Sequence, residues 1–382
     1  MDARREPRSS TFERRGRQLP AELAIVVPVF NEVQNVPLLV DAVAKALRGI
    51  AWELVFVDDN SPDGTASEVR SLASHDSRVR IVHRFDRRGL SSACVEGILS
   101  TAAPFIAVMD GDMQHDECVL ADMFERIREG GVDLVIGSRF LEGSPTDAYS
   151  HRRLMLSELA TKLATRIVGT PLTDPMSGFF IITRDAFMAS LPRLSSIGFK
   201  ILLDVTASAP ATLRIAEVPF RFRGRQHGES KLDSLVAWEF AQLLLDKTIG
   251  HVVPVRFVSF VFVGGMGLIV HFAVLTILFE LLAQPFWIAQ AAATLIATSS
   301  NFFLNNILTY RDQRLTGRRL FTGWLTFNLV CLIGALGNVG VAKWLFEHDN
   351  FWAAAALAGI AITTVWNYAM SSIFTWGRGR PS

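Results

Sequence analysis

The last third of the chain holds four long stretches without a charged side chain. Residues 257–279, 281–310, 320–342 and 351–377 contain no Asp, Glu, Lys or Arg. A helix crosses the hydrocarbon core of a membrane with about 20 residues, so each stretch is long enough to span it. Four buried helices of a soluble domain are the alternative, but such helices usually keep a polar face. The sequence therefore predicts an all-α membrane domain with four transmembrane helices.

Charged side chains are dense before residue 250 and scarce after it. Over the whole chain, 38 Lys and Arg nearly balance 37 Asp and Glu. A chain of 382 residues is long enough for about two domains, and the composition places them in different solvents. The composition excludes a disordered chain and a nucleic-acid binder driven by bulk charge. The three cysteines form no CxxC pair, which favours a reduced protein facing the cytosol.

The connections between the four stretches predict a topology. Residues 311–319 carry four arginines against one aspartate, whereas residues 347–350 are acidic. The positive-inside tendency then places residues 311–319 and both termini in the cytoplasm. Residues 1–20 are rich in arginine without the apolar core of a signal peptide, so we expect a flexible basic tail. Residues 233–250 mix apolar positions with polar ones, Gln242 among them, as an amphipathic helix in the membrane interface would.

Two glycine clusters lie inside the predicted spans. Gly264, Gly265 and Gly267 form the first cluster, and Gly334, Gly337 and Gly340 form the second. Small residues at such spacing let membrane helices approach closely. We interpret both clusters as packing positions.

Apolar runs alternate with helical patterns in the part of the chain before residue 250. The runs cover residues 23–30, 53–57, 79–82 and 105–109, and each of the first three precedes a stretch with helical periodicity. Strands that alternate with helices predict a Rossmann-like α/β domain with a parallel sheet. Ligands of open α/β sheets bind beyond the carboxyl ends of the strands.

Acidic clusters follow these runs at the predicted carboxyl ends. Residues 58–65 contain three aspartates with Pro62 and Gly64, which a solvated turn would also explain. The sharper signal is Asp110-Gly-Asp112-Met-Gln114, directly after the fourth run. Two carboxylates and an amide oxygen are ligands that Mg²⁺ or Mn²⁺ prefers, with substrate phosphates completing the shell. We expect a divalent metal at Asp110, Asp112 and Gln114.

Five segments in matching order resemble the dolichyl-phosphate (polyprenyl-phosphate) mannose synthases, which are family 2 glycosyltransferases with the GT-A fold. The resemblance covers about residues 21–232 and rests on Val27-Pro-Val-Phe-Asn-Glu32, Val57-Asp-Asp-Asn-Ser-Pro-Asp-Gly-Thr65, Asp110-Gly-Asp-Met-Gln-His115, Gly137-Ser-Arg139 and Asp174-Pro-Met-Ser-Gly-Phe179. Residues 251–382 are similar to GtrA-like membrane domains, with Asn301-Phe-Phe-Leu-Asn-Asn306 as the main motif. Gly111 departs from the alanine of many relatives.

The resemblance implies roles for particular residues. The guanine nucleotide would be held by Pro28, Phe30, Glu32, Val57 and Asp59, with Phe30 against the ring and Asp59 accepting hydrogen bonds. The donor's diphosphate and its metal would lie at Asp110, Gly111, Asp112 and Gln114. Arg139, Arg225 and Lys231 would bind phosphate groups, and Asp112, Arg139 and Lys231 would carry the catalysis. A basic segment lies just before the membrane part and consists of Arg223, Arg225, His227, Ser230 and Lys231. Without the resemblance, it would also suit an ordinary positive cluster beside a membrane.

The implied reaction transfers mannose from GDP-mannose to a polyprenyl (dolichyl) phosphate at the cytoplasmic face of the bilayer, with inversion. A phosphate monoester is already ionised at neutral pH, so no strong general base is needed. Two alternatives remain open. The first is a transferase that uses UDP-glucose or another nucleotide sugar with the same lipid. The second is a flippase for a lipid-linked sugar, with a vestigial cytosolic domain.

Overall fold

The computed structural model describes residues 20–85, 89–141, 165, 169, 171–195, 200–223, 233–250, 252–349 and 352–377. The chain divides into two compact units, Met1–Lys231 and Leu232–Ser382. The predicted basic tail, except for residue 20, lies outside the described residues, and so do Arg225 and Lys231.

The first unit is built on one mixed sheet. Among its described residues, seven strands follow the order β3-β2-β1-β4-β6-β5-β7. They are β1 (Leu23–Val29), β2 (Trp52–Asp58), β3 (Val79–His83), β4 (Phe105–Val108), β5 (Leu134–Ser138), β6 (Phe180–Thr183) and β7 (Ile215–Pro219). The parallel pairing predicted for the first four strands is confirmed. Beyond β4 the sheet turns mixed, because β6 runs antiparallel to both β4 and β5.

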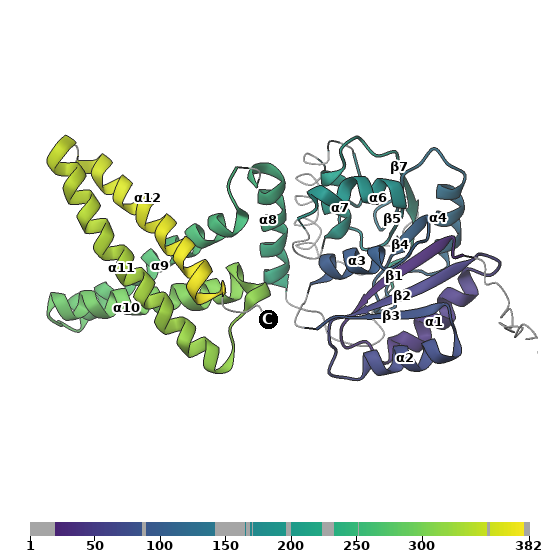
Figure 1. Cartoon of the computed structure of the whole chain (residues 1–382), viewed down its shortest axis with the longest axis horizontal. Helices are drawn as coiled ribbons and strands as arrows, with labels where there is room; N and C mark the ends of the chain where they lie inside the picture. The colour runs from purple at the N-terminus through teal and green to yellow at the C-terminus, as the bar shows by residue number, and fades with distance from the viewer. Residues whose placement is uncertain are drawn as a thin grey trace, which may run out of the picture. The chain divides into compact units, whose positions relative to one another are not determined.

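Helices cover both faces of this sheet (Figure 1). They are α1 (Asn35–Ala46), α2 (Thr65–His75), α3 (Leu90–Leu99), α4 (Val119–Arg128), α6 (Arg184–Ser190), followed by the 3₁₀ turn η1 (Leu191–Arg193), and α7 (Ile201–Ser208). One apolar core joins the sheet to α1, α2 and α4, and a second joins it to α3, α6 and α7. Alternate residues of β1 divide between the cores: Ile25 belongs to the first and Val26 to the second. The continuous apolar run of β1 therefore serves two buried faces.

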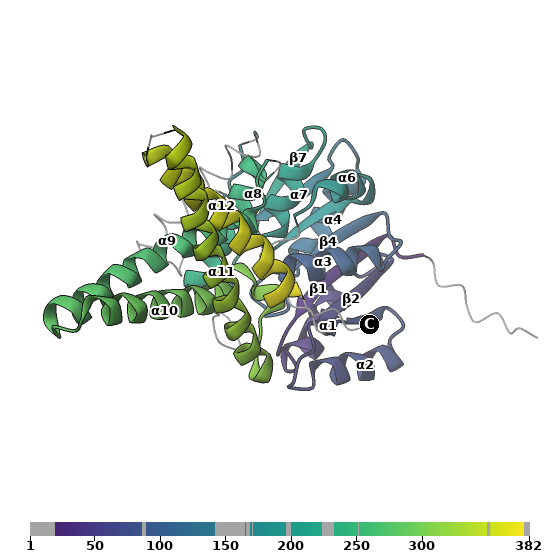
Figure 2. The same cartoon turned by 60° about the vertical axis from the view of Figure 1, so that its left-hand side comes forward.

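The second unit is helical. Its elements are α8 (Asp233–Ile249), α9 (Val255–Thr276), η2 (Ile277–Leu281), α10 (Phe286–Leu304), η3 (Asn305–Thr309), η4 (Arg311–Gln313), α11 (Gly317–Asp349), α12 (Trp352–Met370) and η5 (Ser371–Thr375). Helices α9 and α10 lie side by side, and so do α11 and α12 (Figures 1 and 2). The elements η2, η3 and η5 are π-helical turns that end α9, α10 and α12.

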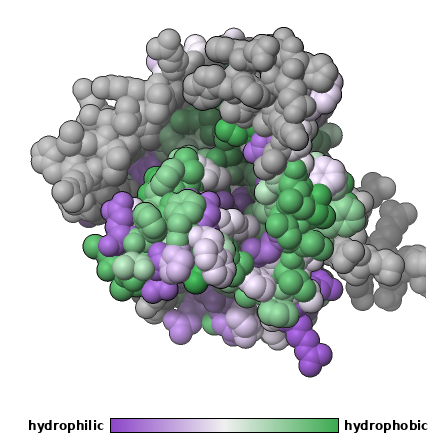
Figure 3. Space-filling model, turned by 90° about the vertical axis from the view of Figure 1, so that its left-hand side faces the viewer, coloured by the Kyte–Doolittle hydropathy of each residue, from purple (hydrophilic) through white to green (hydrophobic). Residues whose placement is uncertain are grey.

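Large apolar side chains remain exposed along these helices. Examples are Ile269 at 71%, Leu336 at 69% and Leu357 at 68% exposed. Figure 3 shows apolar side chains gathered in green on the face that it displays. Exposed apolar surface on this scale is a property of helices that lie in lipid rather than in water.

Three of the four predicted spans coincide with helices long and apolar enough to cross a membrane, within the part that the structure describes. They are Val255–Leu281, Gly317–Asn338 and Leu357–Thr375. Helix α10 forms where the second span, residues 281–310, was expected, but it does not join this group. Its sequence carries polar residues such as Gln290, Thr294 and Ser300, which lower its hydropathy. The count of four spans stays a prediction.

Within each of the two predicted glycine clusters, only one glycine lies in close contact with a neighbouring helix. A Cβ on Gly267 would overlap the side chain of Asn301, and one on Gly334 would overlap that of Asn367. Gly264, Gly265, Gly337 and Gly340 have open space at the same point. Only Gly267 and Gly334 among the six therefore make the close helix contact that the clusters predicted.

Candidate functional site

The carboxyl ends of β1, β2, β4 and β5 meet at one edge of the sheet, as the strand pairings require. Three residues other than glycine adopt the left-handed backbone conformation just beyond these ends. Asn31 follows β1 with φ 60°, Asn60 follows β2 with φ 56°, and Met113 lies beyond β4 with φ 62°. Such conformations are sparsely populated and concentrate at binding sites. The edge predicted from the acidic clusters is thus also where the backbone is strained.

The loop after β2 is tied to the loop after β1. Asp58 accepts hydrogen bonds from the Ser61 backbone and hydroxyl, and Ser61 Oγ accepts one from the Asn31 backbone at 3.0 Å. Further along, Asp63 Oδ1 accepts from the Thr65 backbone at 3.0 Å and Oδ2 from the Val33 backbone at 3.2 Å. These bonds hold both loops in one arrangement at the sheet edge.

Asp59 is held between Arg84 and Gly89. Arg84 Nη1 lies 3.0 Å from Asp59 Oδ1, and the Gly89 backbone donates to Oδ2 at 2.9 Å. Burial raises the pKa of the Asp59 carboxyl, and this rise exceeds the opposite effects of the Gly89 hydrogen bond and of Arg84. Arg84 also donates to Ser92 Oγ at 2.7 Å. The Asp59 carboxylate is therefore a buried hydrogen-bond acceptor whose orientation is fixed by Arg84 and the Gly89 backbone.

The other residues predicted to bind the nucleotide lie at the same edge of the sheet, but the Val57 side chain is buried away from it. Pro28 and Val57 are partners in the β1–β2 pairing. Phe30 and Glu32 follow β1, and Glu32 Oε2 accepts from Asn35 Nδ2 at 2.6 Å. Val57 is fully buried, and its side chain belongs to the apolar core between the sheet and α3. It would therefore contribute through its backbone.

The predicted metal ligands surround the turn after β4. Asp112 is 6% exposed, and its Oδ1 accepts from the Gln114 backbone at 3.1 Å. Gln114 Nε2 donates to the Arg223 carbonyl at 3.2 Å, which leaves Oε1 as its ligating atom. A Cβ at Gly111 would lie 2.8 Å from Val29 Cγ1, so an alanine here would require the Val29 side chain to move. The turn packs against β1 without spare room.

His115 supports Asp110 from inside the turn. Its Nδ1 accepts from the Asp110 backbone at 3.1 Å, and its Nε2 lies 3.7 Å from Asp110 Oδ2. The ring stacks on Phe179 with centroids 5.1 Å apart. Burial lowers the pKa of His115, and burial together with the charge of Asp112 raises the pKa of Asp110.

The donor set fits a hard divalent cation. Within the described residues, no group of three or more His, Cys, Asp or Glu side chains is placed to hold a metal. The turn instead offers two carboxylates and an amide oxygen, and Asp110 and Asp112 repel each other. A cation between them would relieve that repulsion. Such an incomplete oxygen set is typical of Mg²⁺ sites that complete the shell with substrate phosphates.

Arg139 is a paired cation at the end of β5. Its Nε and Nη2 donate to the two carboxylate oxygens of Asp174 at 2.7 and 2.9 Å. The segment that carries Asp174 is itself held by Glu217, whose Oε1 accepts from the Thr173 backbone at 2.9 Å. Gly178 of the same segment lies against Asp110, because a Cβ there would be 3.0 Å from Asp110 Oδ2. Arg139 is thus brought toward residues 110–114, the turn after β4 that carries the predicted metal ligands and is called the metal turn below.

Lys200 is a residue of this site that the sequence analysis missed. Its Nζ donates to the Met176 carbonyl at 3.1 Å, beside the pair of Arg139 and Asp174. Burial, and then the charge of Arg139, lowers the pKa of Lys200 to about 8, against the opposite effect of Asp174 and Asp110. No motif marked it, since a single lysine before an apolar helix resembles an ordinary surface residue.

The predicted basic segment is described only at its start. Arg223 pairs with Asp116 at 2.5 Å and with Glu117 at 2.7 Å, so its charge is compensated beside the metal turn. Arg225 and Lys231 fall outside the described residues, and their proposed contact with phosphate stays a prediction.

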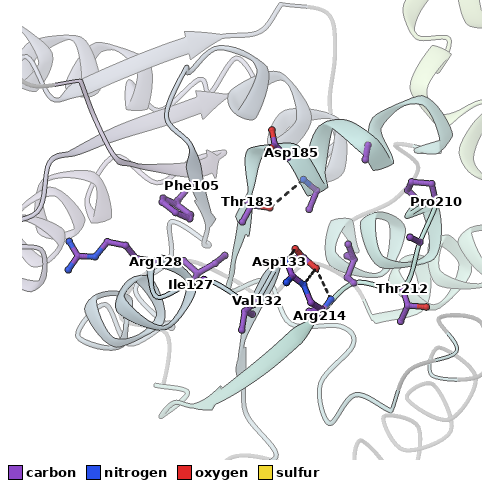
Figure 4. A pocket seen from close by; sticks show the side chains of 16 residues that line it. Phe105, Ile127, Arg128, Val132, Asp133, Thr183, Asp185, Pro210, Thr212 and Arg214 are labelled. Atoms are coloured by element: carbon purple, nitrogen blue, oxygen red, sulfur yellow. Dashed lines mark hydrogen bonds and ion pairs between the residues drawn. The ribbon is translucent and has the colours of Figure 1, made fainter.

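A cavity of about 420 Å³ lies at the opposite edge of the sheet (Figure 4). Asp133 and Thr183, at the start of β5 and the end of β6, line it. Its charged side chains include Asp133 and Arg214, which pair with each other at 2.7 Å. The cavity contains none of the predicted site residues.

Comparisons with known proteins agree with this architecture. Glycosyl transferase family 2 matches residues 24–191, and the GtrA/DPMS transmembrane domain matches residues 259–376. The chain is 32% identical over 361 residues to a dolichol-phosphate mannosyltransferase of Pyrococcus furiosus, covering 93% of this chain and 99% of the relative. It is 36% identical to a protein of the same name from Mycosarcoma maydis, covering 58% of this chain and 78% of the relative. A polyprenol monophosphomannose synthase of Mycolicibacterium smegmatis is 31% identical, covering 54% and 80%.

Among solved structures, glucosyl-3-phosphoglycerate synthase from Mycobacterium tuberculosis matches with 18% identity and a TM-score of 0.45, covering 59% of this chain and 80% of that chain. The protein is a membrane-bound glycosyltransferase with a GT-A-like α/β domain. It belongs to the dolichol-phosphate mannosyltransferase family.

Proposed function

We propose that this protein transfers mannose from GDP-mannose to a polyprenyl phosphate, giving polyprenyl-phosphate mannose and GDP. The observation that carries the proposal is the metal turn after β4, where Asp110, Asp112 and Gln114 form an incomplete oxygen set. Family membership over nearly the whole chain supports the lipid phosphate as acceptor.

The nucleotide would lie over the ends of β1 and β2. Asp59, directed by Arg84 and Gly89, would accept hydrogen bonds from the base, and Phe30 would cover the ring. A buried carboxylate of fixed direction selects a base with N–H donors at the matching position. The two loops that Asp58 and Asp63 tie together would shape this part of the pocket.

The metal would be Mg²⁺ or Mn²⁺, held by Asp110, Asp112 and Gln114. When bound it would neutralise charge that develops on the leaving diphosphate. Arg139 and Lys200 lie beside this turn and would add fixed positive charge where two phosphate-bearing substrates must meet.

The acceptor needs orientation more than activation. Its phosphate oxygen is ionised at neutral pH, since the second pKa of a phosphate monoester is about 6. His115 is occupied by Asp110 and is not required as a base. A single displacement with inversion at the sugar carbon follows from an acceptor that attacks directly.

The acceptor's lipid chain would stay in the bilayer, which accounts for the apolar second unit. The arginine-rich connection 311–319 supports a cytoplasmic placement of the active site and of both chain ends. Cysteine labelling in intact cells tests this topology. Label reaching a cysteine at position 316 from outside would contradict it.

The direct test supplies the purified full-length protein with labelled GDP-mannose or UDP-glucose, polyprenyl phosphate and Mg²⁺ or Mn²⁺. We expect a lipid-linked mannose that requires GDP-mannose and a divalent metal. Transfer from UDP-glucose alone would favour the glucosyltransferase. Absence of transfer from either donor would contradict the proposal.

A further inference from the structure

Glu217 connects strand β7 to the segment that leads into β6. It lies opposite Ile136 of β5 in the pairing of the two strands. Its Oε1 accepts from the Thr173 backbone at 2.9 Å, from the Thr173 hydroxyl at 2.8 Å and from the Asp174 backbone at 3.3 Å. One side chain therefore holds two consecutive residues of that segment.

Hydrogen bonds continue from Thr173 to the end of β5. The Glu217 carboxylate can only accept, so the Thr173 hydroxyl donates its one proton to it. The contact of 2.6 Å between the Thr173 and Ser138 hydroxyls must then use the proton of Ser138. Ser138 Oγ in turn accepts from the Phe140 backbone at 3.2 Å. The donors therefore follow one direction, from Phe140 through Ser138 and Thr173 to Glu217.

Arg139 is restrained on two sides by this chain of hydrogen bonds. Both of its neighbours in the sequence, Ser138 and Phe140, belong to the chain. Its ion-pair partner Asp174 is bound to Glu217 through the Asp174 backbone. The position of the Arg139 guanidinium thus depends on Glu217 through the Arg139 backbone and also through the ion pair.

The segment that Glu217 holds also contacts the rest of the candidate site. The Met176 carbonyl accepts from Lys200 Nζ at 3.1 Å. A Cβ on Gly178 would lie 3.0 Å from Asp110 Oδ2 of the metal turn. A displacement of this segment would therefore change the position of Arg139 relative to the metal turn.

We propose that Glu217 is a positioning residue that sets the place of Arg139 beside the metal turn. Fixed charge stabilises a transition state only when it is already directed at the atoms on which charge develops. A misplacement of about 1 Å, caused by a change far from the chemistry, can cost about 100-fold in rate. The inference rests on the proposed function, because that function gives Arg139 a reacting phosphate.

Asp133 offers a matched control at the other end of the same two strands. It directly precedes β5, and its carboxylate accepts from Arg214, which directly precedes β7 (Figure 4). Asp133 and Glu217 are thus both carboxylates that tie the β7 side of the sheet to its neighbours. A carboxylate that only stabilises the sheet should behave like Asp133 when it is removed.

The first measurement is the exchange of backbone amide hydrogens in the full-length protein, followed by mass spectrometry without substrate. Glu217→Ala should raise the exchange of residues 172–179 about 10-fold, because this segment loses its acceptor. Residues 58–65, the loop after β2, should exchange as in the wild type. Asp133→Ala should change neither segment. Unchanged exchange of residues 172–179 in Glu217→Ala would overturn the proposal.

The second measurement is kcat and KM with the donor that the wild type uses. Glu217→Ala should lower kcat about 10- to 100-fold. The KM for the nucleotide sugar should stay near wild type, because the nucleotide residues follow β1 and β2. Glu217→Gln keeps an acceptor oxygen and should restore kcat to within about 3-fold of the wild type. Thr173→Val removes only the hydroxyl link and should lower kcat about 3- to 10-fold, which tests the chain even where Glu217→Ala does not fold.

A double-mutant cycle tests whether Glu217 acts through Arg139. In an Arg139→Ala background, Glu217→Ala should lower kcat by no more than about 2-fold, because the group that Glu217 positions is gone. Equal factors in both backgrounds would overturn the proposal, and so would a fall in kcat for Asp133→Ala as large as that for Glu217→Ala.

The proposed function and this proposal can fail separately. The variants are compared as ratios to the wild type with whichever donor is used, so a different donor sugar would leave the role of Glu217 intact. Absence of transfer by the wild type would contradict the proposed function. The exchange experiment would still decide whether Glu217 holds residues 172–179, because it needs no substrate.

Discussion

Arg139 and Asp174 form a two-pronged ion pair in which both carboxylate oxygens accept a hydrogen bond from the guanidinium. Arg139 follows β5, and Asp174 lies in the segment that leads into the antiparallel strand β6. Asp174 is 1% exposed. The pair therefore ties the mixed half of the sheet to the edge at which the metal turn lies.

Removing the Asp174 carboxylate should deprive the Arg139 guanidinium, whose side chain is 20% exposed, of the two hydrogen bonds that it makes to this carboxylate. We expect Asp174→Ala to lower the free energy of unfolding by about 3–5 kcal/mol, the cost of breaking a buried pair from one side. Arg139→Lys should also destabilise, because an ammonium cannot bind both oxygens in the same plane. Thermal unfolding of the full-length protein in detergent measures both. Asp133→Ala, which breaks the exposed pair with Arg214, is the control and should matter little.

Asp112→Ala should abolish transfer while leaving the protein folded and inserted in the membrane. Loss of a metal ligand removes several kcal/mol of the stabilisation that the metal gives to the charged transition state. This loss corresponds to a fall in rate of at least about 100-fold. Turnover is measured across Mg²⁺ and Mn²⁺ concentrations, with Asp122→Ala on the exposed side of α4 as control. Near-normal turnover of Asp112→Ala with either metal would contradict the assignment of Asp112 as a metal ligand.

Lys231→Gln and Arg225→Gln separate phosphate binding from membrane attraction. A lysine that only touches the headgroups contributes about 1 kcal/mol of surface attraction, and the membrane helices anchor the chain regardless. A cation that holds a reacting phosphate should instead cost about 30- to 1,000-fold in rate when lost. Arg318→Gln is the control in the connection 311–319. Equal, mild effects at all three positions would favour simple anchoring.

The strand-end carboxylates could be predicted because local sequence defines them. Asp110 and Asp112 follow a short apolar run whose length is typical of a buried strand, and parallel strands place such ends at one edge. Lys200 could not be predicted in this way. Its surroundings come from Arg139, Asp174 and Met176, which the antiparallel strand β6 brings together across the sheet.

The membrane unit shows the same limit. Composition predicted its apolar helices, but it treated six glycines alike, although Gly267 and Gly334 alone among them lie against an asparagine. Periodicity likewise placed Gln242 on a polar face, while the structure buries it against Ser259. Helix partners decide these contacts, and they are set by tertiary packing rather than by local pattern.

Asp63 should make the stability of the first unit depend on pH. Burial alone would raise the pKa of Asp63, but hydrogen bonds from Thr65 and Val33 outweigh it and hold the pKa below its usual value. A lowered folded pKa contributes stability above the unfolded pKa of about 3.9 and loses it as the pH falls through the folded value. Asp63→Asn keeps an oxygen acceptor but loses the charge that strengthens these hydrogen bonds, so at this exposed position it should cost at most about 1 kcal/mol at pH 7. Unfolding followed from pH 7 to 3 should show the two proteins converging, and a constant difference would contradict the assignment.

Gly267→Ala and Gly334→Ala should destabilise the membrane unit to a similar extent. At each position a Cβ would overlap the asparagine side chain of the neighbouring helix, Asn301 or Asn367, so that side chain or its helix must move. Overpacking of this kind costs about 1–3 kcal/mol. Gly264→Ala and Gly337→Ala have open space and serve as controls in the same two helices; alanine's better helix propensity makes them neutral or slightly stabilising. Unfolding in mixed micelles measures all four. No loss at Gly267→Ala and Gly334→Ala, or an equal loss at the two control positions, would contradict this packing.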